Sequence, residues 1–170
     1  MGFELNLMAA EYQLPGRIKT TSAMKKVFPI GLAVLLMLSA CQPEPQPIQM
    51  GQEECAHCSM MINDEQFAAQ LVTETGRHYN FDAIECMAAY SNEFDGDIHS
   101  LWVYDYFSPG EWIDATEVTF LKSDQLRSPM SVNISAYRQQ EDAEQNQAEY
   151  EGNLLNWDEV RQLVREEWGQ

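Results

Sequence analysis

The stretch FAAQLVTETGRHYNFDAIECM, residues 67–87, decides the fold of this chain. Apolar and other side chains alternate over residues 67–72, which predicts a strand. A Glu-Thr-Gly turn follows, and residues 77–81 predict a second strand, so the two form a hairpin. Asp82 and Glu85 then have the spacing of a capping box, which predicts that a helix begins here.

Further elements are expected on the C-terminal side of this unit. Three more strands are predicted at residues 101–107, 117–122 and 132–137. Residues 138–150 are polar and helix-forming, and Asn156 with Glu159 forms a capping box for a last helix. This order predicts an α+β fold of two ββα-type units packed together.

The N-terminus has the pattern of an export signal. Lys25 and Lys26 precede an apolar run over residues 27–38, which is too short to span a bilayer. The run ends in small residues, as signal peptides do, so residues 1–40 are expected to be a signal peptide. Met24 is the more natural start, which makes residues 1–23 a mis-called start.

Cys41 directly follows this segment, and the sequence Leu-Ser-Ala-Cys resembles the lipobox of bacterial lipoproteins. The resemblance implies that Cys41 carries the lipid anchor on the periplasmic side of a bacterial membrane, with the outer membrane favoured because Gln42 is not Asp. Residues 41–52 are rich in proline and glutamine and predict a tether. The folded domain is expected over residues 53–170.

The charge of the chain excludes one class of partner. A formal net charge of −17 repels phosphate backbones, so nucleic acid is not expected to bind. No nucleophile–base pair, phosphate loop or carboxylate pair stands out, so a binding protein is expected rather than an enzyme. With Cys41 assigned to lipid, three cysteines remain, and an odd number in an oxidising compartment leaves at least one free or bound to something.

Residues 55–61, Cys-Ala-His-Cys-Ser-Met-Met, collect the donors that suit a soft metal ion. Thiolate and thioether sulfur select Cu(I) over harder ions. Cys58 and Met60 are one residue apart, which places them on the same side of an extended segment. A third donor must come from elsewhere, and Met130 in the Ser-Pro-Met-Ser loop is the best candidate.

Other readings of these residues remain open. Cys55 and Cys58 could form a disulfide or the redox pair of a thiol–disulfide oxidoreductase, although such a motif should open a helix after a strand. Cys55, Cys58 and Cys86 with His57 could hold a structural zinc ion, in an awkward geometry. Cys86 is otherwise expected to be a buried small hydrophobic residue, and Met61 a core residue.

The chain resembles the NosL family of lipoprotein copper chaperones, which serve the assembly of nitrous oxide reductase. The resemblance is carried by residues 55–61, 80–87, 102–106, 112–115 and 128–130. It implies that Cys58, Met60 and Met130 bind Cu(I), with Cys55 and His57 as possible further donors. It also implies that nitrous oxide reductase or its membrane assembly complex is the partner.

The sequence departs from the family pattern at two positions. Ser59 and Ser131 stand where the family usually has glycine, after the motif cysteine and after the Pro-Met pair. Glycine allows positive φ, so the substitutions bear on the local backbone conformation. Neither of them removes a metal donor.

Overall fold

The computed structural model describes residues 43–169. The predicted signal peptide and Cys41, the predicted lipidation site, lie outside the described residues. Within the described part, no helix combines the length and apolarity needed to cross a bilayer.

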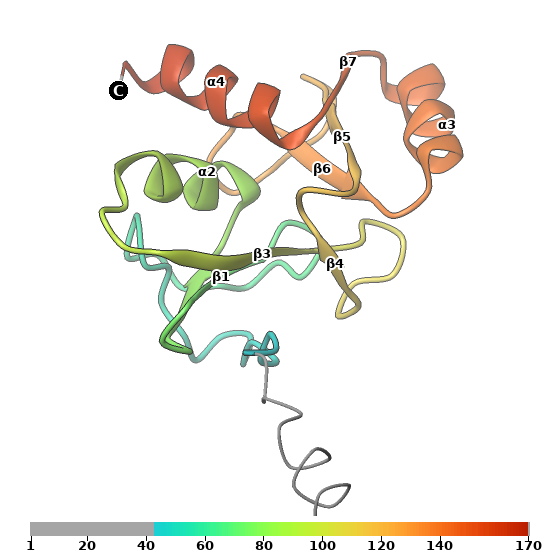
Figure 1. The fold of residues 1–170 in the computed structure, drawn as a ribbon. Coiled ribbons are helices and arrows are strands. Elements are labelled where there is room, and N and C mark those ends of the chain that lie inside the picture. The colour runs from blue at the N-terminus through green and yellow to red at the C-terminus, as the bar shows by residue number, and fades with distance from the viewer. Residues whose placement is uncertain (1–42, 170) are drawn as a thin grey trace, which may run out of the picture. The chain divides into compact units, whose positions relative to one another are not determined.

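The first unit is built on a four-stranded antiparallel sheet in the order β2-β1-β3-β4 (Figure 1). Its strands are β1 (Ala69–Thr73), β2 (His78–Phe81), β3 (Ile98–Tyr104) and β4 (Trp112–Asp114). The predicted hairpin is confirmed, since β1 pairs with β2 and Gly76 turns the chain at a φ of 78°. Strand β4 was not predicted, because three residues are too few to establish an alternating pattern.

The N-terminal segment covers part of this sheet instead of standing away from it. The Gln46 backbone N–H donates to Oε1 of Gln70 (2.8 Å), and Gln70 Nε2 donates back to the Gln46 carbonyl (3.0 Å). Ile48 is buried in the main core. Residues 44–52, expected to be part of a tether, therefore contact the folded domain ahead of the expected boundary at residue 53. They satisfy the side-chain amide of Gln70, which is fully buried.

The second unit contains a three-stranded antiparallel sheet in the order β6-β5-β7. Its elements are β5 (Thr119–Lys122), β6 (Ile134–Tyr137), α3 (Gln140–Tyr150), β7 (Asn153–Leu155) and α4 (Trp157–Trp168). The capping box predicted for the last helix is confirmed: Asn156 Oδ1 accepts from the Glu159 N–H, and Glu159 Oε2 accepts from the Asn156 N–H.

Helix α2 (Ile84–Glu93) joins the two units. It contacts β1 and β2 of the first sheet, and also α4 and β6 of the second unit (Figure 1). One hydrophobic core includes Leu71 and Met87 from the first unit together with Phe120 and Val160 from the second. The predicted α+β fold of two packed ββα-type units is therefore confirmed, with β3 and β4 added to the first unit and β7 and α4 to the second.

Candidate metal site

The cysteine motif lies in a tight hairpin that precedes the first sheet. The Ser59 N–H donates to the Cys55 carbonyl (2.9 Å), and the Cys55 N–H donates to the Met60 carbonyl (2.8 Å). A further bond, from Ala56 N–H to the Asn80 carbonyl (2.8 Å), fixes the hairpin to β2. The motif is thereby held beside the junction of β2 and α2.

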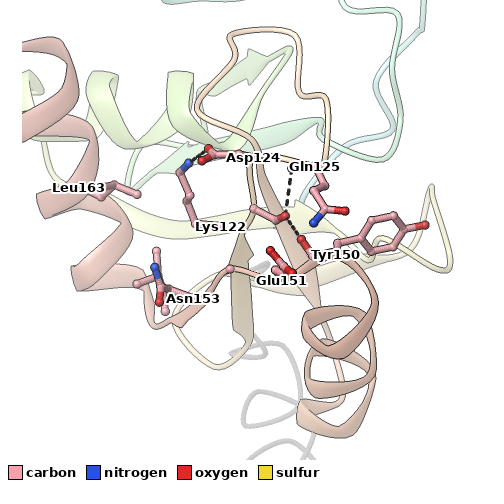
Figure 2. Close-up of a pocket in the computed structure, with 10 residues that line it drawn as sticks. Lys122, Asp124, Gln125, Tyr150, Glu151, Asn153 and Leu163 are labelled. Carbon is pink, nitrogen blue, oxygen red and sulfur yellow. Dashed lines mark hydrogen bonds and ion pairs between the residues drawn. The ribbon is translucent and has the colours of Figure 1, made fainter.

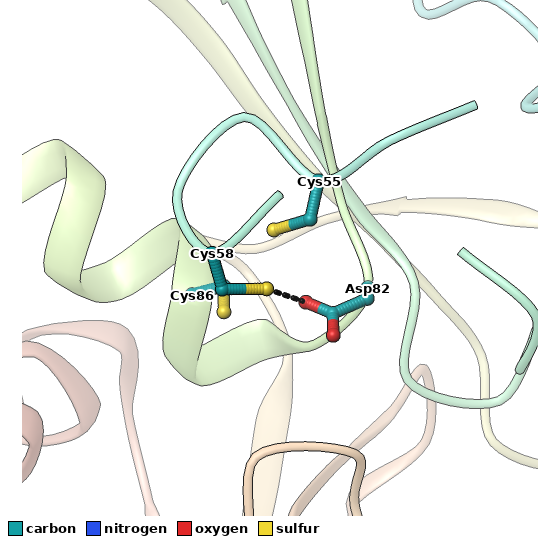
Figure 3. Close-up of side chains that lie close together, drawn as sticks. All are labelled: Cys55, Cys58, Asp82 and Cys86. Carbon is teal, nitrogen blue, oxygen red and sulfur yellow. Dashed lines mark hydrogen bonds between the residues drawn. The ribbon is translucent and has the colours of Figure 1, made fainter. Parts of the chain in front are cut away.

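Three thiols and one carboxylate meet at this junction (Figure 3). The sulfur atoms of Cys55, Cys58 and Cys86 and a carboxylate oxygen of Asp82 all lie within 4.8 Å of one another. Cys55 and Cys86 are buried, Cys58 is half-buried, and all three are free thiols. We call these four residues the thiol cluster. Cys86 is buried as expected, but its sulfur also belongs to this group.

The capping box predicted for Asp82 and Glu85 is wrong. Helix α2 has Ala83 as its N-cap and no side-chain cap. Asp82 Oδ1 instead accepts a hydrogen bond from the Cys58 thiol (3.5 Å). Its second oxygen, Oδ2, is buried and has no partner among the described residues. Tertiary contacts with the hairpin have replaced the local capping bond.

Glu85 holds the loop that carries Met130. Its Oε1 accepts from the Ser128 hydroxyl and from the Val132 N–H (3.3 Å). The Ser128 N–H donates to Oδ1 of Asn133 (3.1 Å), and the Asn133 N–H donates to the Ser128 hydroxyl oxygen (2.9 Å). The Pro-Met loop is therefore fixed to the first turn of α2, beside Cys86.

The two predicted donor segments thus contact the start of α2, at Asp82 just before its N-cap and at Glu85 in its first turn, although 70 positions separate Met60 from Met130 in the sequence. Met60 is 50% exposed, and Met130 is half-buried against the main core. Met61 is 42% exposed, so the prediction that it is a core residue is wrong. The ligand set Cys58, Met60 and Met130 remains a prediction.

Both serines at the family's glycine positions have left-handed backbone conformations. The φ angle is 61° at Ser59 and 68° at Ser131. A non-glycine residue rarely adopts such angles. Both serines therefore have the backbone conformation that glycine would favour at these positions.

The histidines contact other groups. The His57 ring stacks on Trp168 of α4, with 5.6 Å between the centroids and 7° between the planes. His78 Nε2 contacts the Glu44 carbonyl oxygen at 2.9 Å. A donor role for His57 remains a prediction, and its ring links the hairpin to the last helix.

The thiols of the cluster differ in acidity. A hydrogen bond from the Cys86 thiol lowers the pKa of Cys55 to about 6. Burial raises the pKa of Cys58 to about 11, and the hydrogen bond to Cys55 raises that of Cys86. At neutral pH the cluster therefore holds one thiolate, at Cys55, and two protonated thiols.

A separate pocket of about 260 Å³ lies beside β5 and β7 (Figure 2). Lys122 pairs with Asp124 at its edge, and the Ser123 hydroxyl donates to the Tyr150 carbonyl (2.6 Å). None of the residues lining it is a cysteine or methionine. It therefore lacks the soft donors that the sequence analysis singled out.

Sequence reasoning missed Asp82 and Glu85 as site residues because their spacing matched a helix cap. No local signal pointed to these roles, because Asp82 precedes the N-cap Ala83 and the partners of both carboxylates come from distant segments. The thiol–disulfide motif does not open a helix, since residues 55–58 lie in the hairpin. The setting expected for an oxidoreductase is therefore absent from this part of the described chain.

Comparisons with known proteins agree with this fold. The crystal structure of the copper chaperone NosL from Shewanella denitrificans matches with a TM-score of 0.60 and 22% sequence identity, covering 69% of this chain and 96% of that one. At this identity the match shows a shared fold. A search of curated proteins finds no match. The sequence profile of the NosL family matches residues 47–164, a span that includes the hairpin, the thiol cluster and the Pro-Met loop. The chain therefore belongs to the NosL family.

Proposed function

We propose that this protein is a copper chaperone that carries Cu(I) on Cys58, Met60 and Met130. The observation that supports it most is the attachment of both donor segments to the start of α2, one just before its N-cap and the other in its first turn. Asp82 contacts the Cys58 thiol, and Glu85 contacts the loop of Met130.

The chemistry of the three donors suits a cargo ion. One thiolate and two thioethers neutralise a monovalent ion without adding excess negative charge, and soft sulfur favours Cu(I). Met60 is half-exposed, so an incoming donor from a partner can reach the ion before a resident donor leaves. This associative exchange passes copper on without exposing the free ion, and the role is delivery rather than catalysis.

The destination and the location are part of the proposal. The acceptor is nitrous oxide reductase or its membrane assembly complex, as the family resemblance implies. Lipid on Cys41 holds the protein on the periplasmic side of a bacterial membrane, with the outer membrane favoured. The net charge of −17 favours a cationic docking surface on the acceptor.

A Cu(I) competition titration tests the ligand set. The reduced protein competes with a chromophoric Cu(I) chelator, and the free chelator is read by absorbance. Cys58→Ser should abolish tight binding, while Met60→Leu and Met130→Leu should each weaken it. Met61→Leu is the matched control, because Met61 is an equally exposed neighbour without an assigned role.

Wild-type affinity in the Cys58 variant would overturn the proposal. Appreciable insulin reduction by the metal-free protein would instead favour a thiol–disulfide oxidoreductase.

A further inference from the structure

We propose that Cys55 and Cys86 form, together with Cys58, an inner Cu(I) position that shares Cys58 with the outer Cys58–Met60–Met130 position. The inference rests on the proposed function, in that it takes copper as the cargo. It adds a buried place where the ion is held before transfer.

The spacing of the sulfur atoms supports a metal position. A metal–thiolate bond of about 2.3 Å, the value for zinc, places three sulfur atoms around one ion about 4 Å apart. The three sulfur atoms of the cluster lie within 4.8 Å of one another. Side-chain shifts of less than about 1 Å would therefore close the site, without movement of the helix.

The burial of the cluster is a second, independent observation. Asp82 is 1% exposed, and its Oδ2 has no hydrogen-bond partner among the described residues. A buried carboxylate that adjoins three thiols and has one unpartnered oxygen is unfavourable in a protein interior unless a cation or donor approaches it. A monovalent cation among the sulfur atoms would bring a positive charge close to this carboxylate. Asp82 is not itself a ligand in this proposal, because carboxylates are hard donors.

The two positions differ in exposure, which gives each a role. Cys86 is fully buried and Cys55 is 2% exposed, whereas Met60 is 50% exposed. Cys58, which the two positions share, is half-buried. Copper in the inner position is shielded from competing ligands, and copper in the outer position is within reach of a partner.

Transfer between the positions is a ligand exchange around Cys58. Met60 and Met130 bind as Cys55 and Cys86 leave, and the ion remains Cu(I) throughout. Cys58 and Cys86 release their protons to solvent when copper binds, and Cys55 is already a thiolate at neutral pH. Cys86 takes its proton back from solvent when the ion moves outward.

Two cysteine variants test the inner position in the full-length protein, reduced under anaerobic conditions. Cys86→Ala and Cys55→Ser should each lower Cu(I) affinity by about tenfold or more, and copper should pass to the chelator faster. Met87→Leu is the matched control, since Met87 is a fully buried sulfur residue next to Cys86 in α2 but lies outside the cluster. Copper X-ray absorption should count three sulfur neighbours around the ion in the wild type. In both cysteine variants this set of sulfur neighbours should differ from that of the wild type. Circular dichroism checks the fold, and Cys55→Ser, which lies in the hairpin, serves if the helix variant does not fold.

The outcomes separate this inference from the proposed function. If both folded cysteine variants bind copper with wild-type affinity while Cys58→Ser has lost it, the inner position is refuted and the chaperone proposal stands. If Cys58→Ser binds as the wild type does, the chaperone proposal itself fails. Preference for Zn(II) over Cu(I) in direct competition would also overturn the inner copper position.

Discussion

Replacing Ser59 or Ser131 with glycine should stabilise the protein without changing its copper chemistry. Both serines have left-handed φ angles, 61° and 68°, and both are exposed, so the change removes no buried side chain. Neither hydroxyl makes a hydrogen bond among the described residues. Backbone conformation alone therefore sets the effect.

The expected magnitude follows from two opposing contributions. The left-handed conformation costs a non-glycine residue about 1–2 kcal/mol. Glycine loses more freedom on folding, which costs about 0.5–1 kcal/mol. The difference is a net stabilisation of roughly 0.5–1 kcal/mol for each substitution.

Urea unfolding followed by circular dichroism measures this difference. Ser108→Gly is the control, because Ser108 lies in a turn but does not have a positive φ, so glycine there should destabilise. The reasoning is refuted if Ser59→Gly and Ser131→Gly destabilise as Ser108→Gly does. Cu(I) affinity should be the same in all three variants, since none of the three residues is an assigned donor.

Further predictions concern other parts of the fold. Burial raises the pKa of Glu85 above its ordinary value of 4.5, so the protein loses stability as the pH rises from that value toward the folded-state pKa. In urea unfolding, the free energy of unfolding of Glu85→Gln should therefore rise relative to that of the wild type as the pH rises. A difference in unfolding free energy that stays constant with pH would contradict this. Gly152→Ala should lower the unfolding free energy by roughly 2–5 kcal/mol, because φ is +115° and a Cβ would meet the Lys122 carbonyl oxygen at 2.1 Å; Gly110→Ala, in open space at a φ of +92°, isolates the backbone contribution. The ultraviolet absorbance of the metal-free protein should show one thiolate titrating near pH 6, and Cys55→Ala should remove it; an unchanged titration would show that another thiol ionises.

Local patterns predicted the parts of the fold that local interactions determine. The hairpin around Gly76 needs only alternation and a turn residue, and the cap formed by Asn156 and Glu159 joins residues three apart. The same cap pattern at Asp82 and Glu85 failed, because partners 24 and 43 positions away compete for those carboxylates. Sequence spacing carries no information about such partners.

The candidate site was predictable in its chemistry but not in its arrangement. The donor types around Cys58 indicate soft-metal binding on their own. The place of Cys86 in the same group depends on how the hairpin docks on β2, through the bond from Ala56 to Asn80. That contact is tertiary, so the sequence alone predicted only that Cys86 is a buried small hydrophobic residue.

The most direct test of the central claim labels the thioethers themselves. In the Cys86→Ala variant, which lacks the inner position, copper is confined to the outer one; produced with selenomethionine and loaded with Cu(I), this variant should show selenium neighbours at bonding distance in copper X-ray absorption. Met60→Leu and Met130→Leu should each remove part of that signal, and the double variant all of it. A copper spectrum without selenium neighbours in this labelled variant would contradict the account, because the ion would then be held without either thioether.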